Sequence, residues 1–100
     1  MKYFRALSIM FDPLPVPAED VPKIYIPMHE AHIAAGIAAG NVLLAGPKTE
    51  EGGGLMIARF ESREALDEFL SRDPFVTNGL ARFDVKEFRL ADRSENVKDW

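Results

Sequence analysis

Residues 27–47, PMHEAHIAAGIAAGNVLLAGP, decide the fold of this chain. Pro27 suits the first turn of a helix, where its missing amide hydrogen would have no helical partner. The alanine-rich stretch that follows propagates the helix, and Gly40-Asn41 supplies the left-handed cap that ends it. A short buried strand over 42–45 comes next and is stopped by Gly46-Pro47. The segment therefore predicts a helix that leads directly into a strand.

Outward from this segment, the remaining patterns complete a mixed fold. Strands are predicted over 3–11, 55–60 and 81–90, with a helix over 63–71 that Ser62 caps and a short turn from Asp73-Pro74 to Asn78-Gly79. A change in which residues face inward, between Val85 and Phe88, predicts a bulge in the last strand. The order is that of the ferredoxin-like βαββαβ fold, an α+β class with an antiparallel sheet.

The proline-rich connection over 12–27 is predicted to be stiff and irregular, with Val21 to Ile26 prolonging irregular or extended structure. A connection of this length in a compact domain is a candidate functional loop. Its role and that of the charged tail over 91–100, which ends in Trp100, stay open at this point.

Composition limits the classes of function. One hundred residues, 47% hydrophobic and 28% charged, predict one globular domain over 1–100. No apolar run approaches the roughly 20 residues that span a bilayer. The chain has no cysteine, which excludes disulfides and thiolate metal sites and suits the cytoplasm. A net charge of -4 without a basic run argues against a nucleic-acid partner.

Helical periodicity separates the two histidines of the first helix. At 100° per residue, one inward face holds His29, Ile33, Gly36, Ile37 and Gly40, whereas His32 lies at its edge. Gly36 in mid-helix costs about 1 kcal/mol relative to alanine, which predicts a close approach of the helix to the sheet. The two helices should cover one sheet face. Alternate apolar residues on the other face predict a second copy as cover, hence a homodimer.

The motifs resemble those of the YCII-related family of small dimeric α+β barrel proteins over nearly the whole chain. The residues that carry the resemblance are Pro27 and His29, Gly40, Leu43-Leu44, Ala45-Gly46-Pro47, the glycine-rich loop, and Asp73-Pro74-Phe75-Val76. The histidine in that pattern stands eleven residues before the glycine and eighteen before the proline, which fits His29 and not His32. The family often has an arginine where this chain has Ile26.

This resemblance implies a histidine–aspartate active-site dyad, carried over onto His29 and Asp73, and its characterised members include a dehydrochlorinase-type lyase acting on an aromatic ring. The topology makes the pair plausible, because antiparallel helices bring the start of the first to the end of the second. A structural reading stays open for both residues. Asp before Pro is an ordinary helix N-cap, and an inward histidine in a first turn can simply be a hydrogen-bonded boundary residue.

Other candidate sites are weaker. Met28, His29, Glu30 and His32 resemble a metal cluster but lack a third ligand of matching geometry, so no metal is predicted. The Gly52-Gly53-Gly54 loop lacks the residues of a phosphate loop and is interpreted as a flexible hairpin connection. The weaker candidates for contact with a small ligand are Tyr3, Tyr25, His32, Pro47 and Phe75.

The leading functional hypothesis is a cofactor-free lyase or isomerase in which His29 is the general base and Asp73 orients it. The substrate would be a small, aromatic or otherwise unsaturated organic molecule. The alternative is a non-catalytic ligand-binding or accessory module. A third hypothesis, a cofactor-free oxygenase, rests on fold analogy alone.

Overall fold

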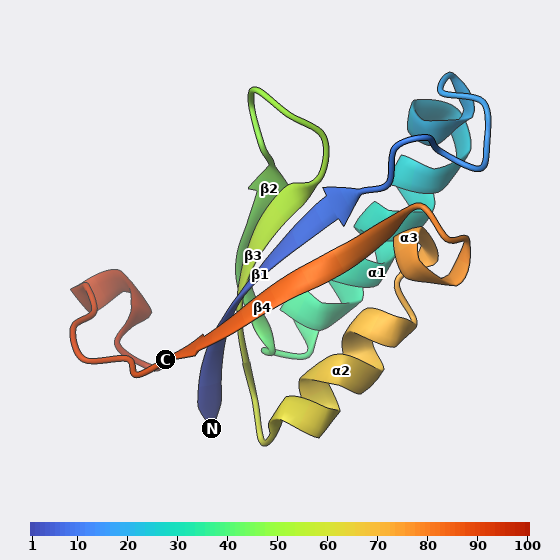
Figure 1. Cartoon of the computed structure of the whole chain (residues 1–100). Coiled ribbons are helices and arrows are strands. Elements are labelled where there is room, and N and C mark those ends of the chain that lie inside the picture. Colours follow the sequence, from blue (N-terminus) through green and yellow to red (C-terminus); the bar gives the residue numbers. More distant parts are fainter.

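The computed structural model describes residues 1–100 as one sheet with helices packed on it (Figure 1). The elements in chain order are β1 (Lys2–Met10), a π-helical turn (Val21–Tyr25), α1 (Ile26–Ala38), β2 (Val42–Pro47), β3 (Gly54–Phe60), α2 (Arg63–Ser71), α3 (Pro74–Thr77), β4 (Ala81–Phe88) and a 3-10 turn (Glu95–Val97). No helix has the length and apolar character needed to cross a bilayer.

The sheet has four strands in the order β2-β3-β1-β4, and every neighbouring pair is antiparallel. Figure 1 places α1, α2 and α3 together on one face of this sheet. Helix α1 connects the central strand β1 with the edge strand β2, and α2 and α3 together connect the central strand β3 with the edge strand β4, as the split βαβ pattern requires. The predicted ferredoxin-like α+β class is confirmed.

The main core lies between the helices and the inward face of the sheet. The central strands β1 and β3 contribute small and large residues alternately, which lets the helices approach closely. The buried members are Phe4, Ala6, Ile33, Val42, Met56, Ala58, Phe60, Leu66 and Leu70. A smaller cluster of Phe75, Leu80 and Ala81 packs beside the start of α1. This second cluster fixes the segment after α2 next to the first turn of α1.

Gly36 marks the closest approach of α1 to its neighbours. A Cβ atom built there would lie 2.8 Å from both Phe69 Cζ of α2 and Val42 Cγ2 of β2. The predicted close approach therefore exists, but it is to a phenylalanine of the neighbouring helix and the first residue of the edge strand. Ile37, predicted to face inward, is 49% exposed.

The segment over 21–26 corrects a prediction. It forms a π-helical turn, in which the Ile26 amide bonds to the Val21 carbonyl, and it runs directly into α1. Pro22 is tolerated because it occupies the first turn, where its missing amide has no partner to lose. Helical structure therefore starts six residues before Pro27.

The strand ends also differ from the prediction. The register of β4 with β1 is continuous from Met10↔Ala81 to Tyr3↔Phe88, so the predicted bulge is wrong. Phe88 lies on the outer face, with its ring 6.2 Å from that of Tyr3. The sheet irregularity falls instead in β2, between Val42 and Leu44.

Two boundaries shift as well. The last strand ends at Phe88 and does not continue to Leu90. The second strand continues through Gly46-Pro47, because β2 lies at the sheet edge, where a proline removes no hydrogen bond that the sheet needs.

The outer sheet face is partly apolar and is covered at one end by the tail. Leu7, Ile9, Leu55 and Ile57 are half-buried there, and Leu44 is exposed. At the end where β1 starts, the Tyr3 hydroxyl donates to the Trp100 carbonyl, and the Arg59 guanidinium lies 4.3 Å from the centre of the Trp100 ring. The charged tail is therefore anchored through its final tryptophan.

Candidate functional site

A cleft of about 1000 Å³ opens between the N-terminal half of α1, the loop from β2 to β3, and the segment that follows β1. This volume is at the upper end of the range typical of small-molecule sites, roughly 300–1000 Å³. Most lining side chains are apolar, among them Met10, Leu14, Ile26, Ile33, Met56 and Phe83. The proline-rich connection thus forms one wall of the cleft. An apolar wall of this kind suits a small organic molecule.

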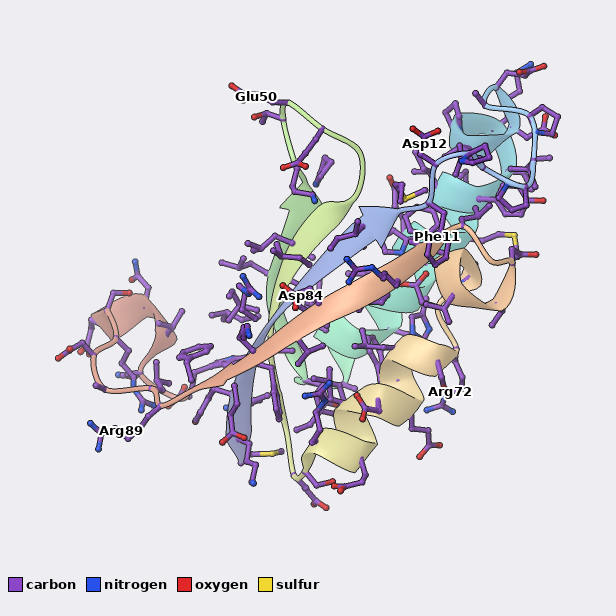
Figure 2. All side chains as sticks on the ribbon, in the orientation of Figure 1. Phe11, Asp12, Glu50, Arg72, Asp84 and Arg89 are labelled. Carbon is purple, nitrogen blue, oxygen red and sulfur yellow. The ribbon has the colours of Figure 1, made fainter.

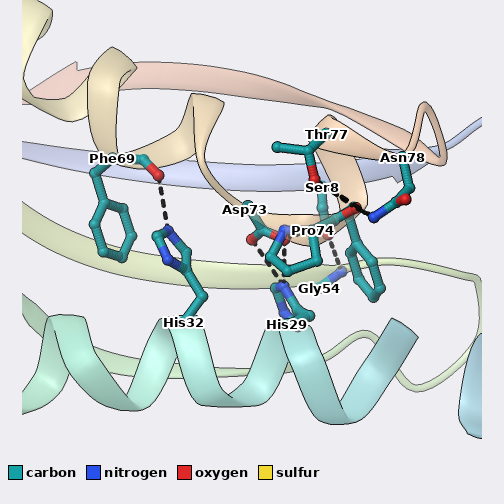
Figure 3. A network of polar contacts seen from close by, with 10 residues as sticks. Ser8, His29, His32, Gly54, Phe69, Asp73, Pro74, Thr77 and Asn78 are labelled. Carbon is teal, nitrogen blue, oxygen red and sulfur yellow. Dashed lines mark hydrogen bonds and ion pairs between the residues drawn. The ribbon is translucent and has the colours of Figure 1, made fainter. Parts of the chain in front are cut away.

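His29 and Asp73 meet beside this cleft (Figure 3). The His29 Nδ1 atom lies 2.7 Å from Asp73 Oδ2 and 2.9 Å from Oδ1. Asp73 is fully buried and caps α3, where its Oδ1 accepts the Phe75 amide at 2.9 Å. The carboxylate therefore acts as a helix cap and as a histidine partner at the same time. The two roles do not compete, since a carboxylate accepts several hydrogen bonds.

The His29 ring is held on one face by Phe75. The two rings are stacked with centroids 4.1 Å apart and planes 4° from parallel. Because an ionised carboxylate only accepts, Nδ1 carries the proton that bonds to Asp73, and Nε2 keeps a free lone pair. Nε2 makes no hydrogen bond within the chain, and His29 is a lining residue of the cleft. The arrangement can accept a proton from a bound molecule.

His32, one turn further along α1, is used differently. Its Nε2 atom lies 2.8 Å from the Phe69 carbonyl, which can only accept, so this nitrogen carries the proton. Its ring stacks on Phe69 at 4.3 Å, and it does not line the main cleft. His32 therefore joins α1 to α2.

Of the other candidate ligand contacts, the structure brings only Pro47 and Phe75 to the cleft. Tyr3 lies at the start of β1 beside Trp100, whereas the cleft is at the end of that strand. Tyr25 packs against the small cluster around Phe75. Spacing along the chain could not exclude the two tyrosines, because both depended on how the ends of β1 and α1 are placed. No group of three or more His, Asp or Glu side chains is arranged to hold a metal ion.

The glycine-rich loop lines the cleft, and its anchoring on β1 is a structural part of the site that sequence reasoning missed. Gly53 has φ +83, and a Cβ atom there would lie 2.0 Å from the Ser8 carbonyl oxygen. The Gly54 amide donates to Ser8 Oγ at 2.7 Å. The base of the loop is thus held against β1. The signal was Ser8 itself, a polar residue at an inward position of a strand whose neighbours there are Phe4 and Ala6.

A model of the YCII-related domain matches residues 21–89, a range that includes the π-helical turn, both members of the His29–Asp73 pair and the glycine-rich loop. The chain belongs to the YCII-related domain family. A search of curated proteins gave no match in sequence.

Several solved structures resemble this YCII-related domain, among them the following two. One is 5-chloro-2-hydroxyhydroquinone dehydrochlorinase from Burkholderia phenoliruptrix AC1100, in complex with 2,5-dihydroxybenzoquinone: TM-score 0.64, 18% identity, covering 87% of this chain and 93% of that one. The other is an antibiotic biosynthesis monooxygenase: TM-score 0.54, 15% identity, covering 92% of this chain and 100% of that one. At these identities the likeness establishes the fold alone.

Proposed function

We propose that this YCII-related domain is an enzyme that moves a proton on a small, aromatic or otherwise unsaturated organic molecule without a cofactor. The observation that carries the proposal is the hydrogen bond that His29 Nδ1 donates to the buried Asp73 carboxylate. This bond leaves Nε2 of His29, a residue that lines the cleft, without a partner in the chain. A histidine oriented by a carboxylate is the usual arrangement for a general base.

The reaction begins when His29 Nε2 takes a proton from a C–H or O–H group of the bound molecule. The electron pair of the broken bond stays on the substrate, which must delocalise it, and this requirement favours an aromatic or enolic ligand. Asp73 stabilises the imidazolium that results. The imidazolium then gives its proton back to the substrate or to solvent. Return to another carbon gives isomerisation, whereas departure of an anion from the substrate gives elimination.

The fold likeness is compatible with this class of reaction. The dehydrochlorinase that resembles this chain is a lyase whose structure holds a quinone. Because the identity is 18%, its substrate is not transferred to this protein. The proposal retains only the general reaction class, which is proton transfer on an oxygenated ring.

A substrate screen with matched variants tests the proposal. Hydroxylated and halogenated aromatic compounds and small enones are offered to the wild type, to His29→Ala and to His32→Ala, with turnover followed by absorbance and chloride release. We expect turnover that His29→Ala removes and that His32→Ala retains, because His32 contacts the Phe69 carbonyl and not the cleft. Turnover that survives His29→Ala would refute the role of this base.

A non-catalytic ligand-binding or accessory module is the alternative, and one observation favours it. Asp73 has a sufficient structural reason to be present, since it caps α3. In that case small molecules bind in the cleft and are released unchanged. A cofactor-free oxygenase is the third candidate, and it would consume dissolved oxygen during turnover.

We further propose that the protein acts as a homodimer in the cytoplasm. The partly apolar outer face, with exposed Leu44 beside half-buried Leu7 and Ile57, supports a second copy as its cover. The lack of cysteine suits a reducing compartment. A mass near that of one chain in light scattering would contradict the dimer.

A further inference from the structure

We propose that Lys48 determines the ligand specificity of the cleft. It selects ligands that carry an apolar ring and, at one end of the molecule, one anionic oxygen group such as a carboxylate or phenolate. The inference deepens the proposed function, on which it rests for the identity of the cleft as the binding site. It begins with charge: Lys48 is the only lysine or arginine among the residues that line the cleft.

Lys48 is unusually sheltered for a lysine. Its side chain is 19% exposed, whereas those of Lys2 and Lys98 are 54% and 66% exposed. Lysine is among the residues most rarely buried, because an ammonium group needs water or a close partner. The sheltered Lys48 side chain is therefore part of the cleft wall, and it brings a positive charge to the cleft.

The ammonium group is poorly satisfied by the protein itself. Its ion-pair partner is Glu51, with Nζ and Oε2 3.8 Å apart, and Lys48 Nζ makes no hydrogen bond within the chain. The Glu51 side chain is 72% exposed, and a pair of this geometry is weak. Three N–H donors are therefore available to a ligand oxygen.

The backbone that carries Lys48 is fixed. The Lys48 amide donates to the Gly53 carbonyl at 2.9 Å, and Gly53 and Gly54 are seated on Ser8. Glu50 projects from the tip of the same loop, away from the sheet (Figure 2). The neck of the loop thus presents Lys48 from a rigid support.

The other charges on the wall favour a single orientation of the ligand. Asp12, Glu30 and Glu51 also line the cleft, and all are exposed residues at its margin. Asp12 and Glu30 repel an anionic group placed beside them, which favours a position of the anion at Lys48, where Glu51 is its competitor. The apolar ring then lies along the cleft, which His29 lines as well.

Binding of a matched pair of probes tests the inference. We use 4-hydroxybenzoate and 4-hydroxybenzamide, which differ in the charge of one group, with calorimetry for affinity and the His29 ring signals in NMR to locate the probe. We expect the wild type to bind the acid about tenfold more tightly than the amide, as one charge-assisted contact allows. Lys48→Met should remove this preference and leave the amide affinity unchanged.

A second variant acts in the opposite direction. Glu51→Gln removes the competing carboxylate and should strengthen binding of the acid severalfold. The inference is wrong if neither probe binds, if acid and amide bind equally, or if the preference survives Lys48→Met. His29→Gln keeps the preference, since Lys48 provides it. If the preference depends on Lys48 while turnover survives His29→Ala, the proposed function fails and this inference stands.

Discussion

The two histidines of α1 lie one turn apart in similar surroundings, yet their chemistry differs. Each ring stacks on a phenylalanine, His29 on Phe75 and His32 on Phe69. Each also joins α1 to a neighbouring segment by a bond of 2.7–2.8 Å. His29 uses Nδ1 on a buried carboxylate, whereas His32 uses Nε2 on a backbone carbonyl. Only His29 keeps Nε2 free on a residue of the cleft.

The comparison teaches that a site is defined by the ring nitrogen in use and the charge of its partner, and not by the presence of a histidine. A backbone carbonyl can hold an imidazole in place, but it carries no formal charge that would stabilise the protonated ring. A carboxylate both holds the ring and stabilises the imidazolium. The following predictions test this difference between His29 and His32.

The largest expected effect comes from removing each histidine in turn. His29→Ala should lower kcat by about 10²–10⁴, the usual contribution of a general base. His32→Ala should lower it only severalfold, through a slight shift of α1. Steady-state kinetics on the substrate found in the screen measures both. Equal losses would show that the two histidines serve one structural role.

The next effect separates the two roles of Asp73. Asp73→Asn retains an oxygen to cap α3, but its amide cannot stabilise an imidazolium, so we expect kcat to fall about 10–100-fold with the fold intact. Asp73→Ala also loses the cap, which should lower the free energy of unfolding by about 1–2 kcal/mol more.

Urea unfolding measured beside kcat distinguishes the two Asp73 variants. If Asp73→Asn retains full activity, the carboxylate is a cap alone, and the bond to His29 has no catalytic role.

A smaller effect is expected on the His32 side of the comparison. In Gly36→Ala the new methyl would lie 2.8 Å from Phe69 Cζ, and such overpacking costs about 1–3 kcal/mol. Because His32 stacks on Phe69, its ring signals in NMR should shift while those of His29 stay. Gly46→Ala is the control, since nothing lies within 4 Å of a Cβ atom there. Equal shifts at both histidines would contradict independent surroundings.

The last test requires no substitution and is made on the wild-type protein. The two rings should populate opposite neutral tautomers, with the proton on Nδ1 in His29 and on Nε2 in His32. Nitrogen-15 spectra of the histidine side chains distinguish these forms directly. The same tautomer in both rings would remove the difference on which the proposed base depends.

Much of the fold could be predicted because local chemistry decides it. Gly40 and Ser62 mark helix ends through backbone groups that only neighbouring residues can satisfy, and alternation along β1 determines its inward face. One failure was local, and the other arose where the partner strand is distant in the chain. The π-helical turn at Val21–Tyr25 continues into α1, and the register of β4 depends on β1.

The residues of the site show the same contrast between features that the sequence predicted and features that it did not. Helical phase and the spacing of the YCII-related pattern separated His29 from His32. The resemblance to that family implied Asp73 as its partner, and antiparallel topology made the contact plausible. Ser8 was a sequence signal of an inward polar contact, but it did not name the glycine-rich loop as the partner. No sequence pattern indicated that Lys48 is sheltered in the cleft wall. The Ser8–Gly54 bond joins residues that are 46 positions apart in the chain.

By itself, the sequence determined the order of the elements, the inward direction of His29 and the capping chemistry of Asp73, because each depends on residues within one or two helical turns. The tertiary structure alone decided which nitrogen of each histidine is free, which residues line the cleft and which lysine is sheltered there. Those outcomes depend on the packing of one segment against another, and the energy of that packing is distributed over the whole core.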